Sequence, residues 1–224
     1  MRPSNQDRVL ARPEIGLWVV ADGMGGHAGG AQASRLACEA VEEAVGHGMP
    51  LEDAFEVAHA RVRDAQSKAS SLADMGTTLV AVLEREQAYD LAWVGDSRAY
   101  RYRASNGQFE CLSQDHNLAG RLVRNGSITI EQARSHPHRH ILTDCIGQRV
   151  GLPTVESHAH EWQAGDRLLL CSDGLSGELP DEEIAQWLTS IRSPKAVTEK
   201  LIHRALEAGG RDNISLIVLD APVG

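Results

Sequence analysis

The chain has 224 residues and a mass of 24.3 kDa, which is enough for one domain with a substantial hydrophobic core. Its net charge of −9 and isoelectric point near 5.5 argue against a nucleic-acid-binding protein, because binding to phosphate backbones needs a basic face. No apolar run approaches the roughly 20 residues of a membrane span, and the N-terminus lacks the apolar segment of a signal peptide, so we expect a cytoplasmic protein with no membrane partner.

The four cysteines are scattered along the chain, at Cys38, Cys111, Cys145 and Cys171. Their spacing lacks the C-x-x-C pairs of a zinc ribbon, and nothing in it suggests a disulfide framework. We therefore expect four buried free thiols.

The first segment with functional character is Arg2-Pro3-Ser4-Asn5-Gln6-Asp7. It combines a guanidinium with a carboxylate at the edge of a predicted strand, although an exposed pair of this kind is most often only solvated. Because these residues come almost at the start of the chain, we expect that a natural leading strand is short or has been trimmed.

Residues 19–30 place a carboxylate at the end of an apolar strand and follow it with glycines. The run at residues 15–21 is apolar and β-branched enough for a buried strand, so Asp22 stands at a strand end. A half-solvated carboxylate there is usually capped, paired with a cation or bound to a metal. Gly23 allows a sharp turn and lets its own carbonyl approach an ion. Read alone, Asp-Gly is more often a simple turn, and the G-x-G-x-x-G order of a dinucleotide loop is absent.

Two helices and an antiparallel meander are predicted next. Residues 31–46 and 51–71 carry apolar residues at helical spacing, and His59 is expected to be partly exposed on the second helix. Consecutive strands joined by short turns are expected at residues 75–83, 88–94 and 97–102. Asp96, in the turn between the last two, is interpreted as structural, and Asn106-Gly107 predicts a hairpin into residues 109–112.

Residues 118–124 predict a short helix, inside a longer segment from about residue 117 to 151 that is polar and poorly periodic. This composition is typical of a mobile surface flap, and we call residues 117–151 the flap segment. His136, His138 and His140 alternate within it. A zinc site is the alternative interpretation, but H-x-H-x-H without supporting cysteines or carboxylates is a weak zinc signal.

The last third of the chain repeats the design of the first strand. An apolar run at residues 167–172 ends in Asp173-Gly174. Helices are predicted from Pro180, which suits a first helical turn, and over residues 193–208. A final strand is expected at residues 214–219, with Asp212 at its beginning.

Aspartates at predicted strand ends are the main functional signal, and they are Asp7, Asp22, Asp115, Asp173 and Asp212. Carboxylates gathered without compensating Lys or Arg repel one another, and bound divalent cations usually neutralise such clusters. Ligands that are all oxygen favour Mg²⁺ or Mn²⁺ over zinc or copper. Two such ions roughly 3.5–4 Å apart can share a water, lower its pKa and hold it for attack on phosphorus, while Arg2 can supply a fork for the phosphate oxygens.

Seven motifs occur along the chain, in the order R-x-x-N-Q-D, V-V-A-D-G-M-G-G-H, G-T-T-L, W-V-G-D-S-R-A-Y, L-S-Q-D-H, L-L-L-C-S-D-G-L and R-D-N-I-S. Together they span essentially the whole chain and resemble the ordered motifs of the bacterial branch of the metal-dependent type 2C serine/threonine protein phosphatases. The resemblance is closest to small stand-alone enzymes that oppose Hanks-type kinases, including those associated with type VI secretion.

The resemblance implies an α+β fold, a four-layer α-β-β-α sandwich of two antiparallel sheets flanked by helices. It implies a single catalytic domain over residues 1–224 with the flap segment inserted. The implied activity is hydrolysis of phosphoserine and phosphothreonine in proteins by a hydroxide that bridges two Mn²⁺ or Mg²⁺ ions. Expected partners are phosphorylated proteins and a cognate Hanks-type kinase, and the protein is expected to be a monomer.

The resemblance also implies a role for individual residues. Asp22 would bridge both ions, the Gly23 carbonyl would bind one of them, and Asp173 and Asp212 would bind the other. Asp7 would hold metal-bound water. Arg2 would bind the substrate phosphate, and Asp115 would help to form the weaker third metal site of bacterial members.

Two positions depart from the family pattern. Gln6 stands where many members carry Glu, which removes one negative charge beside the second metal. Met24 stands where animal members place a histidine proposed as general acid, and His27 is the candidate replacement, with a loop-structuring role as an equal alternative.

Two other classes of function compete with the phosphatase hypothesis. A catalytically silent binding or regulatory module of the same fold should have lost a metal-site aspartate, whereas this chain retains all the core ones. A two-metal phosphoesterase for nucleotides or nucleic acid is the third reading. The missing basic stripe weighs against nucleic acid.

Overall fold

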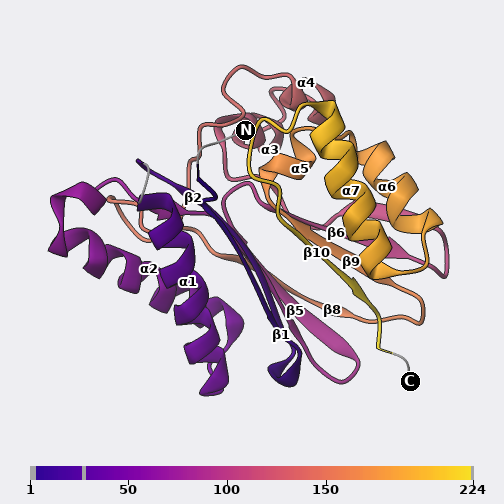
Figure 1. The fold of residues 1–224 in the computed structure, drawn as a ribbon, viewed down its shortest axis with the longest axis horizontal. Helices are drawn as coiled ribbons and strands as arrows, with labels where there is room; N and C mark the ends of the chain where they lie inside the picture. The colour runs from indigo at the N-terminus through magenta and orange to yellow at the C-terminus, as the bar shows by residue number, and fades with distance from the viewer. Residues whose placement is uncertain (1–3, 27–28, 223–224) are drawn as a thin grey trace.

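The computed structural model describes residues 4–26 and 29–222. Two antiparallel sheets stack face to face, and helices cover the outer face of each sheet (Figure 1). The expected four-layer α-β-β-α sandwich is therefore confirmed. None of the described helices is both long enough and apolar enough to cross a membrane.

The first sheet contains, in spatial order, β1 (Asp7–Arg12), β2 (Leu17–Met24), β4 (Leu79–Glu84), β5 (Ala88–Val94) and β8 (Glu156–Glu161), with the short β3 (Gly76–Thr77) paired to β2. The second sheet contains β10 (Leu216–Asp220), β9 (Arg167–Cys171), β6 (Arg98–Arg103) and β7 (Gln108–Cys111). The first sheet is covered by α1 (Gly29–Gly46) and α2 (Leu51–Lys68), and the second by α6 (Asp181–Ser190) and α7 (Pro194–Ala208). The remaining elements are α3 (Leu118–Arg124), α4 (Ile130–Arg134), α5 (Asp173–Ser176) and the 3-10 turns η1 (Pro13–Ile15) and η2 (Ser70–Leu72).

The strands are apolar on both faces because each sheet is packed on both sides. In β2, Val19 packs toward α1 and α2, whereas its neighbour Val20 packs between the two sheets. In β9, Leu168 faces the other sheet and Leu169 faces α6 and α7. Successive side chains of a strand point to opposite faces, so a continuous apolar run fills two of the three hydrophobic layers at once.

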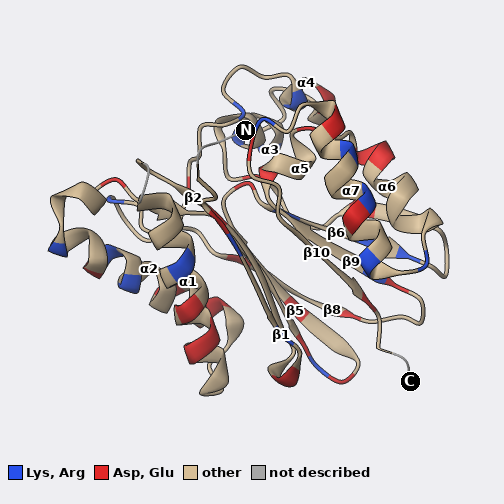
Figure 2. Ribbon diagram, viewed as in Figure 1, with Lys and Arg blue, Asp and Glu red and all other residues tan. Residues whose placement is uncertain are grey.

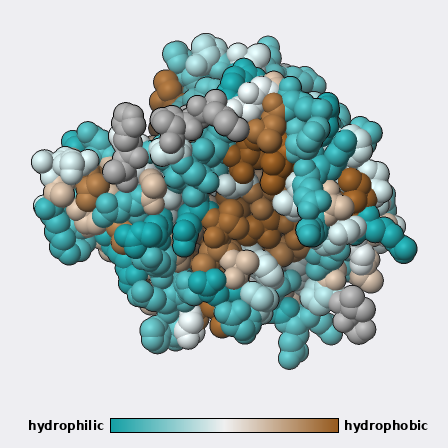
Figure 3. Space-filling model, viewed as in Figure 1, coloured by the Kyte–Doolittle hydropathy of each residue, from teal (hydrophilic) through white to brown (hydrophobic). Residues whose placement is uncertain are grey.

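The two sheets each have one edge strand on the same side of the molecule. These are β1 and β10, which lie between α1 and α7 in Figure 1. In the same view, the space-filling surface between the two helix layers is apolar (Figure 3). Val9 of β1 is 42% exposed there, which is high for a valine of a sheet.

The predicted three-strand meander is wrong at its second turn. β4 and β5 pair as expected, but β6 pairs with β7 and β9 in the other sheet. The chain changes sheets at Gly95, whose φ of +105° favours glycine, and where a Cβ atom would lie 2.7 Å from the Thr78 side chain. This crossover carries Asp96 out of an ordinary hairpin turn and toward the end of β2.

Several local features differ from the sequence-based expectations. The polar edge strand β8, the helix α4 and the short helix α5 were not predicted, since their sequences carry little apolar periodicity. All four cysteines are free, but only Cys38 and Cys171 are buried, while Cys111 is exposed.

His59 of α2 is buried, contrary to the expectation of partial exposure, and is only 5% exposed. Its Nδ1 accepts a hydrogen bond from the Gly147 backbone N–H at 3.1 Å, so it ties α2 to the end of the flap segment. Burial, and to a smaller extent the charge of Arg63, lowers the pKa of His59. The imidazole is therefore held in its neutral form.

We expect this histidine to contribute to acid sensitivity. In the unfolded chain His59 takes up a proton near pH 6.5, whereas its lowered folded-state pKa delays protonation, so stability is lost as the pH falls below about 6.5. Thermal unfolding from pH 7.5 to 5.5 should show a smaller loss for His59→Gln than for the wild type. The exposed-site control His47→Gln should retain the wild-type loss, and identical slopes for all three proteins would contradict the assignment.

Candidate active site

Two Asp-Gly pairs meet at one end of the sandwich, one from each sheet. Asp22 lies near the end of β2, and Asp173 begins α5 just beyond β9. A Cβ atom on Gly23 would lie 2.1 Å from the Gly30 carbonyl oxygen, and one on Gly174 would lie 1.8 Å from the Asn213 carbonyl oxygen. Only glycine permits these approaches, which bring each aspartate against a neighbouring loop.

Asp7 joins the two sheets at the same place. It is the cross-strand neighbour of Asp22 in the β1–β2 ladder. Ser172 Oγ donates to Asp7 Oδ2 at 2.9 Å, and the Ser215 N–H donates to Ser172 Oγ at 3.1 Å. Asp7 is therefore held by the second sheet as well as by its own, and its position relative to Asp22 is set by the backbone.

The threonines of the G-T-T-L motif form hydrogen bonds with the backbone of Asp22. The Asp22 N–H donates to Thr78 Oγ1 at 3.0 Å, and Thr77 Oγ1 donates to the Asp22 carbonyl oxygen at 2.9 Å. Thr78 Oγ1 also lies 2.6 Å from Ser97 Oγ. The role of these threonines was not predicted from the sequence, where the available signal is two adjacent hydroxyl residues before a buried strand.

The aspartates form an electrostatic cluster that is short of positive charge. Burial, followed by the charges of Asp7, Asp173 and Asp96, raises the pKa of Asp22 well above its usual value. Burial also raises the pKa of Asp7, against hydrogen bonds that lower it, and the nearby Asp212 adds to the rise. Asp173 Oδ1 is buried and has no hydrogen-bond partner among the described residues. Carboxylates in this condition are suited to a divalent cation.

The donor set fits Mn²⁺ or Mg²⁺ because its side-chain donors are all carboxylate oxygens. Within residues 4–26 and 29–222, no three His, Cys, Asp or Glu side chains already form a closed metal-binding group. The cluster is instead open, with carboxylates that face one another in pairs. Asp212 accepts a hydrogen bond from the Asn213 N–H at 2.7 Å, which orients it on the turn before β10.

The structure places Asp115 and Asp96 differently from the sequence-based expectation. Both oxygens of Asp115 accept hydrogen bonds from Arg98, each at 2.8 Å, so this carboxylate is already paired. Asp96 is only 8% exposed, and burial, then the charges of Asp173 and Asp115, raises its pKa well above the usual value. Within the described part of the chain, the side chain that donates a hydrogen bond to Asp96 is Asn117, through Nδ2 at 3.4 Å. Asp96 thus lies within reach of the charges of the cluster, whereas Asp115 is engaged by Arg98.

This distinction predicts stability effects of opposite sign in the metal-free protein. Asp96→Asn should raise the free energy of unfolding by about 1–2 kcal/mol, because it removes a buried charge that is repelled by its neighbours. Asp115→Asn should lower it by about 1–3 kcal/mol, because Arg98 loses its charged partner. Urea unfolding in EDTA at neutral pH measures both changes, and shifts of the same sign would contradict the assignment.

Gln6 has a structural role in this site. Its Nε2 lies 3.3 Å from the Gly25 carbonyl oxygen and 3.5 Å from that of Gly26, to which it donates. Its backbone N–H donates to Asn213 Oδ1 at 2.9 Å. The side-chain amide of Gln6 thus anchors the glycine loop after Asp22 by donating hydrogen bonds. An ionised carboxylate at this position could not donate them.

Other predicted residues are placed as follows. Arg2 and His27 lie outside the described residues. In the flap segment, the rings of His136 and His138 lie 5.6 Å apart, whereas His140 Nδ1 lies 3.6 Å from Asp173 Oδ2. Among the described residues, these three histidines do not form a common metal-binding group.

Residues 3–208 match the family model described as protein phosphatase 2C. The chain belongs to this family. It is 36% identical over 229 residues to the serine/threonine protein phosphatase PstP of Mycobacterium tuberculosis, with 98% of the chain and 43% of PstP covered. It thus spans less than half the length of that relative. It is 34% identical to the serine/threonine phosphatase stp of Listeria welshimeri, with 90% of the chain and 83% of that protein covered.

A solved structure agrees with this assignment. The catalytic domain of PstP in complex with two manganese ions superposes with a TM-score of 0.86 at 33% identity, covering 100% of this chain and 94% of that one. The sandwich is therefore that of a phosphatase-2C-family chain, and a relative that binds manganese supports divalent metal dependence.

Proposed function

We propose that this chain hydrolyses phosphoserine and phosphothreonine in proteins with the help of two Mn²⁺ or Mg²⁺ ions. The observation that carries the proposal is the cluster of buried aspartates whose charges raise one another's pKa. Divalent ions bound there supply a nucleophile derived from water and neutralise the charge of the phosphate. Membership of the protein phosphatase 2C family supports a phosphoprotein substrate.

Each residue of the cluster has a proposed task. Asp22 and the carbonyl of Gly23 would hold the ions from the first sheet, and Asp173 and Asp212 would hold them from the second. Asp7, fixed by Ser172 at 2.9 Å, accepts hydrogen bonds from water and so orients it. In place of Asp115, we assign Asp96 as the carboxylate that would complete a third, weaker ion site.

Two proposed roles concern residues outside the described part of the chain. Arg2 would bind the non-bridging oxygens of the phosphate through its planar guanidinium, which matches a phosphate with two parallel hydrogen bonds. His27 would protonate the departing alkoxide. Met24, at the corresponding family position, has no proton to give.

The test compares three substrate classes with the wild-type protein and Mn²⁺: phosphoserine and phosphothreonine peptides, a nucleotide, and a small aryl phosphate. Release of phosphate from the peptides at a much higher kcat/KM than from the nucleotide supports the proposal. A preference for the nucleotide would favour a different two-metal phosphoesterase. If folded, metal-supplied protein released phosphate from none of them, a silent binding module would be the better description.

The biological setting remains a prediction. A cognate Hanks-type kinase, a role in signalling, a cytoplasmic location and a monomeric state follow from the family resemblance and from the sequence.

A further inference from the structure

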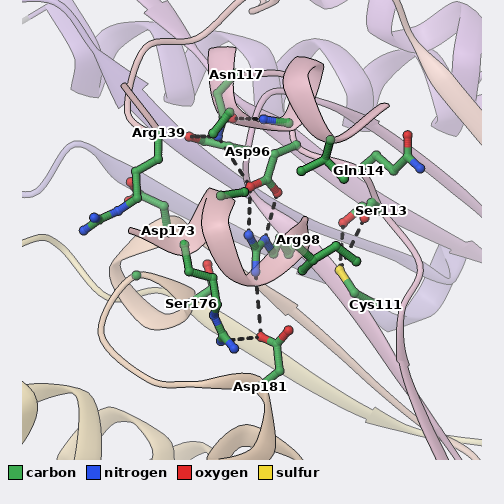
Figure 4. A pocket seen from close by; sticks show the side chains of 18 of the residues that line it. Asp96, Arg98, Cys111, Ser113, Gln114, Asn117, Arg139, Asp173, Ser176 and Asp181 are labelled. Carbon is green, nitrogen blue, oxygen red and sulfur yellow. Dashed lines mark hydrogen bonds and ion pairs between the residues drawn. The ribbon is translucent and has the colours of Figure 1, made fainter. Parts of the chain in front are cut away.

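A cavity of about 500 Å³ lies between the flap segment and the start of α6. Asp96 and Asp173 of the carboxylate cluster line one side of it, so it opens beside the proposed metal centre (Figure 4). Its size is within the range of ligand-binding cavities. The proposed function uses the carboxylates at its side but leaves the rest of the cavity without a role.

Part of the cavity wall is apolar. Its walls come from α3, α4 and the loop before α6, and they include Ala119, Val123, Ile130, Ala133, Leu179 and Pro180. Ile130 is 68% exposed, which is unusual for a large aliphatic side chain. Such walls would gain free energy by burying an apolar side chain of a ligand.

The floor of the cavity is an ion network that is already neutralised. Arg98 stands at its centre, between Asp115 at 2.8 Å and Asp181 at 3.7 Å (Figure 4). Asp181 also accepts hydrogen bonds from the Tyr100 hydroxyl and from Arg134, each at 3.0 Å. Because Asp115 and Asp181 are paired, they repel an acidic ligand less than free carboxylates would, and the ions of the proposed function would neutralise Asp96 and Asp173 at the side of the cavity.

Two cations of the flap segment remain available. Among the described residues, the Arg139 guanidinium makes no hydrogen bond and no close ion pair, and after the Arg211 hydrogen bond its charge is one of the smaller causes that lower the pKa of Glu178. In residues 4–26 and 29–222, the acceptor found for the Arg124 guanidinium is the backbone carbonyl of Asp115, at 3.2 Å. Glu178, also on the cavity wall, is already paired with Arg211 at 2.9 Å. Figure 2 shows basic positions around α3 and α4, in contrast to the acidic start of α6. The flap side of the cavity is therefore its electropositive side.

We propose that this cavity is a specificity subsite that binds the substrate residues flanking the phosphorylated one, and that it prefers an apolar side chain together with an acidic one. The inference rests on the proposed function. A phosphate held at the aspartate cluster leaves its peptide beside Asp96 and Asp173, and an extended chain advances about 3.3 Å per residue, so the next few residues reach the cavity. The apolar residue packs between α3, α4 and Leu179, and the acidic one meets Arg124 and Arg139.

The test uses a panel of phosphothreonine peptides in a Gly-Ser background. One leucine and one glutamate are moved through the three positions on either side of the phosphothreonine, and lysine replaces glutamate in a matched series. For the wild type with Mn²⁺, at least one flanking position should raise kcat/KM about tenfold for Leu over Gly, and another should favour Glu over Lys several-fold.

Paired variants connect these preferences to the cavity. Ala133→Trp fills the apolar part and should abolish the leucine preference, whereas Glu131→Trp, on the exposed side of the same helix, should keep it. Arg139→Glu should reverse the Glu-over-Lys preference, whereas Arg121→Glu, which does not line the cavity, should keep it. Ala133→Leu provides a milder filling variant, and circular dichroism checks the fold of each protein.

The possible outcomes separate the two hypotheses. Loss of preference in the cavity variants alone supports the subsite. Equal kcat/KM across the whole panel for an active wild type, or cavity variants that behave like their controls, overturns the subsite and leaves the phosphatase proposal standing. Absence of phosphate release from every peptide would overturn the proposed function and, with it, the subsite.

Discussion

Asp173→Asn is expected to lower kcat for a phosphothreonine peptide by about 10³-fold or more, which corresponds to about 4 kcal/mol of transition-state stabilisation. The reason is that Asp173 Oδ1 is buried without a hydrogen-bond partner among the described residues, so its negative charge is available to an ion. Asparagine keeps the shape of the side chain and loses that charge. Steady-state phosphate release with saturating Mn²⁺ measures the effect.

The control for this experiment is Asp53→Asn, which removes a carboxylate from an exposed position of α2. It should leave kcat unchanged. Asp173→Asn should also unfold at no lower temperature than the wild type in EDTA, since the substitution relieves repulsion with Asp22. Near-normal turnover in folded Asp173→Asn protein would exclude this carboxylate from the metal centre.

Removal of divalent ions is expected to abolish phosphate release and to lower the unfolding temperature. Without ions, the carboxylates around Asp22 repel one another, and this repulsion adds to burial, the larger cause, in raising their pKa values. Mn²⁺ at 100 times its dissociation constant should stabilise the fold by about 3 kcal/mol, or roughly 5–10 °C in a chain of this length. Thermal scans with EDTA, Mn²⁺ and Mg²⁺ measure the change.

The same scans on Asp173→Asn provide the matched control, because a protein that has lost a ligand should gain less from each ion. Full activity in excess EDTA would contradict metal dependence. A thermal gain of equal size in wild type and variant would show that Mn²⁺ binds elsewhere on the chain.

The sequence by itself determined four of the aspartates that the structure brings together, and its resemblance to a known family implied the layers of the fold. Residues 17–21 in β2 and 168–171 in β9 are continuously apolar, which is typical of strands packed on both faces, and an Asp-Gly pair follows each run at once or one residue later. Asp7 and Asp212 stand beside other strand boundaries. These signals are local, since a few adjacent residues specify both the strand and the exposed carboxylate at its end, and the order of the motifs was enough to indicate the family.

Only the tertiary structure decided which further aspartate joins the cluster. Asp96 and Asp115 both follow a strand in similar polar segments, so their local sequences do not distinguish them. The crossover at Gly95 buries Asp96 near Asp22, whereas Arg98 pairs with Asp115 across 17 residues of sequence. Desolvation and Coulomb energies depend on distances between residues that are remote in the chain, and those distances exist only once the two sheets have packed.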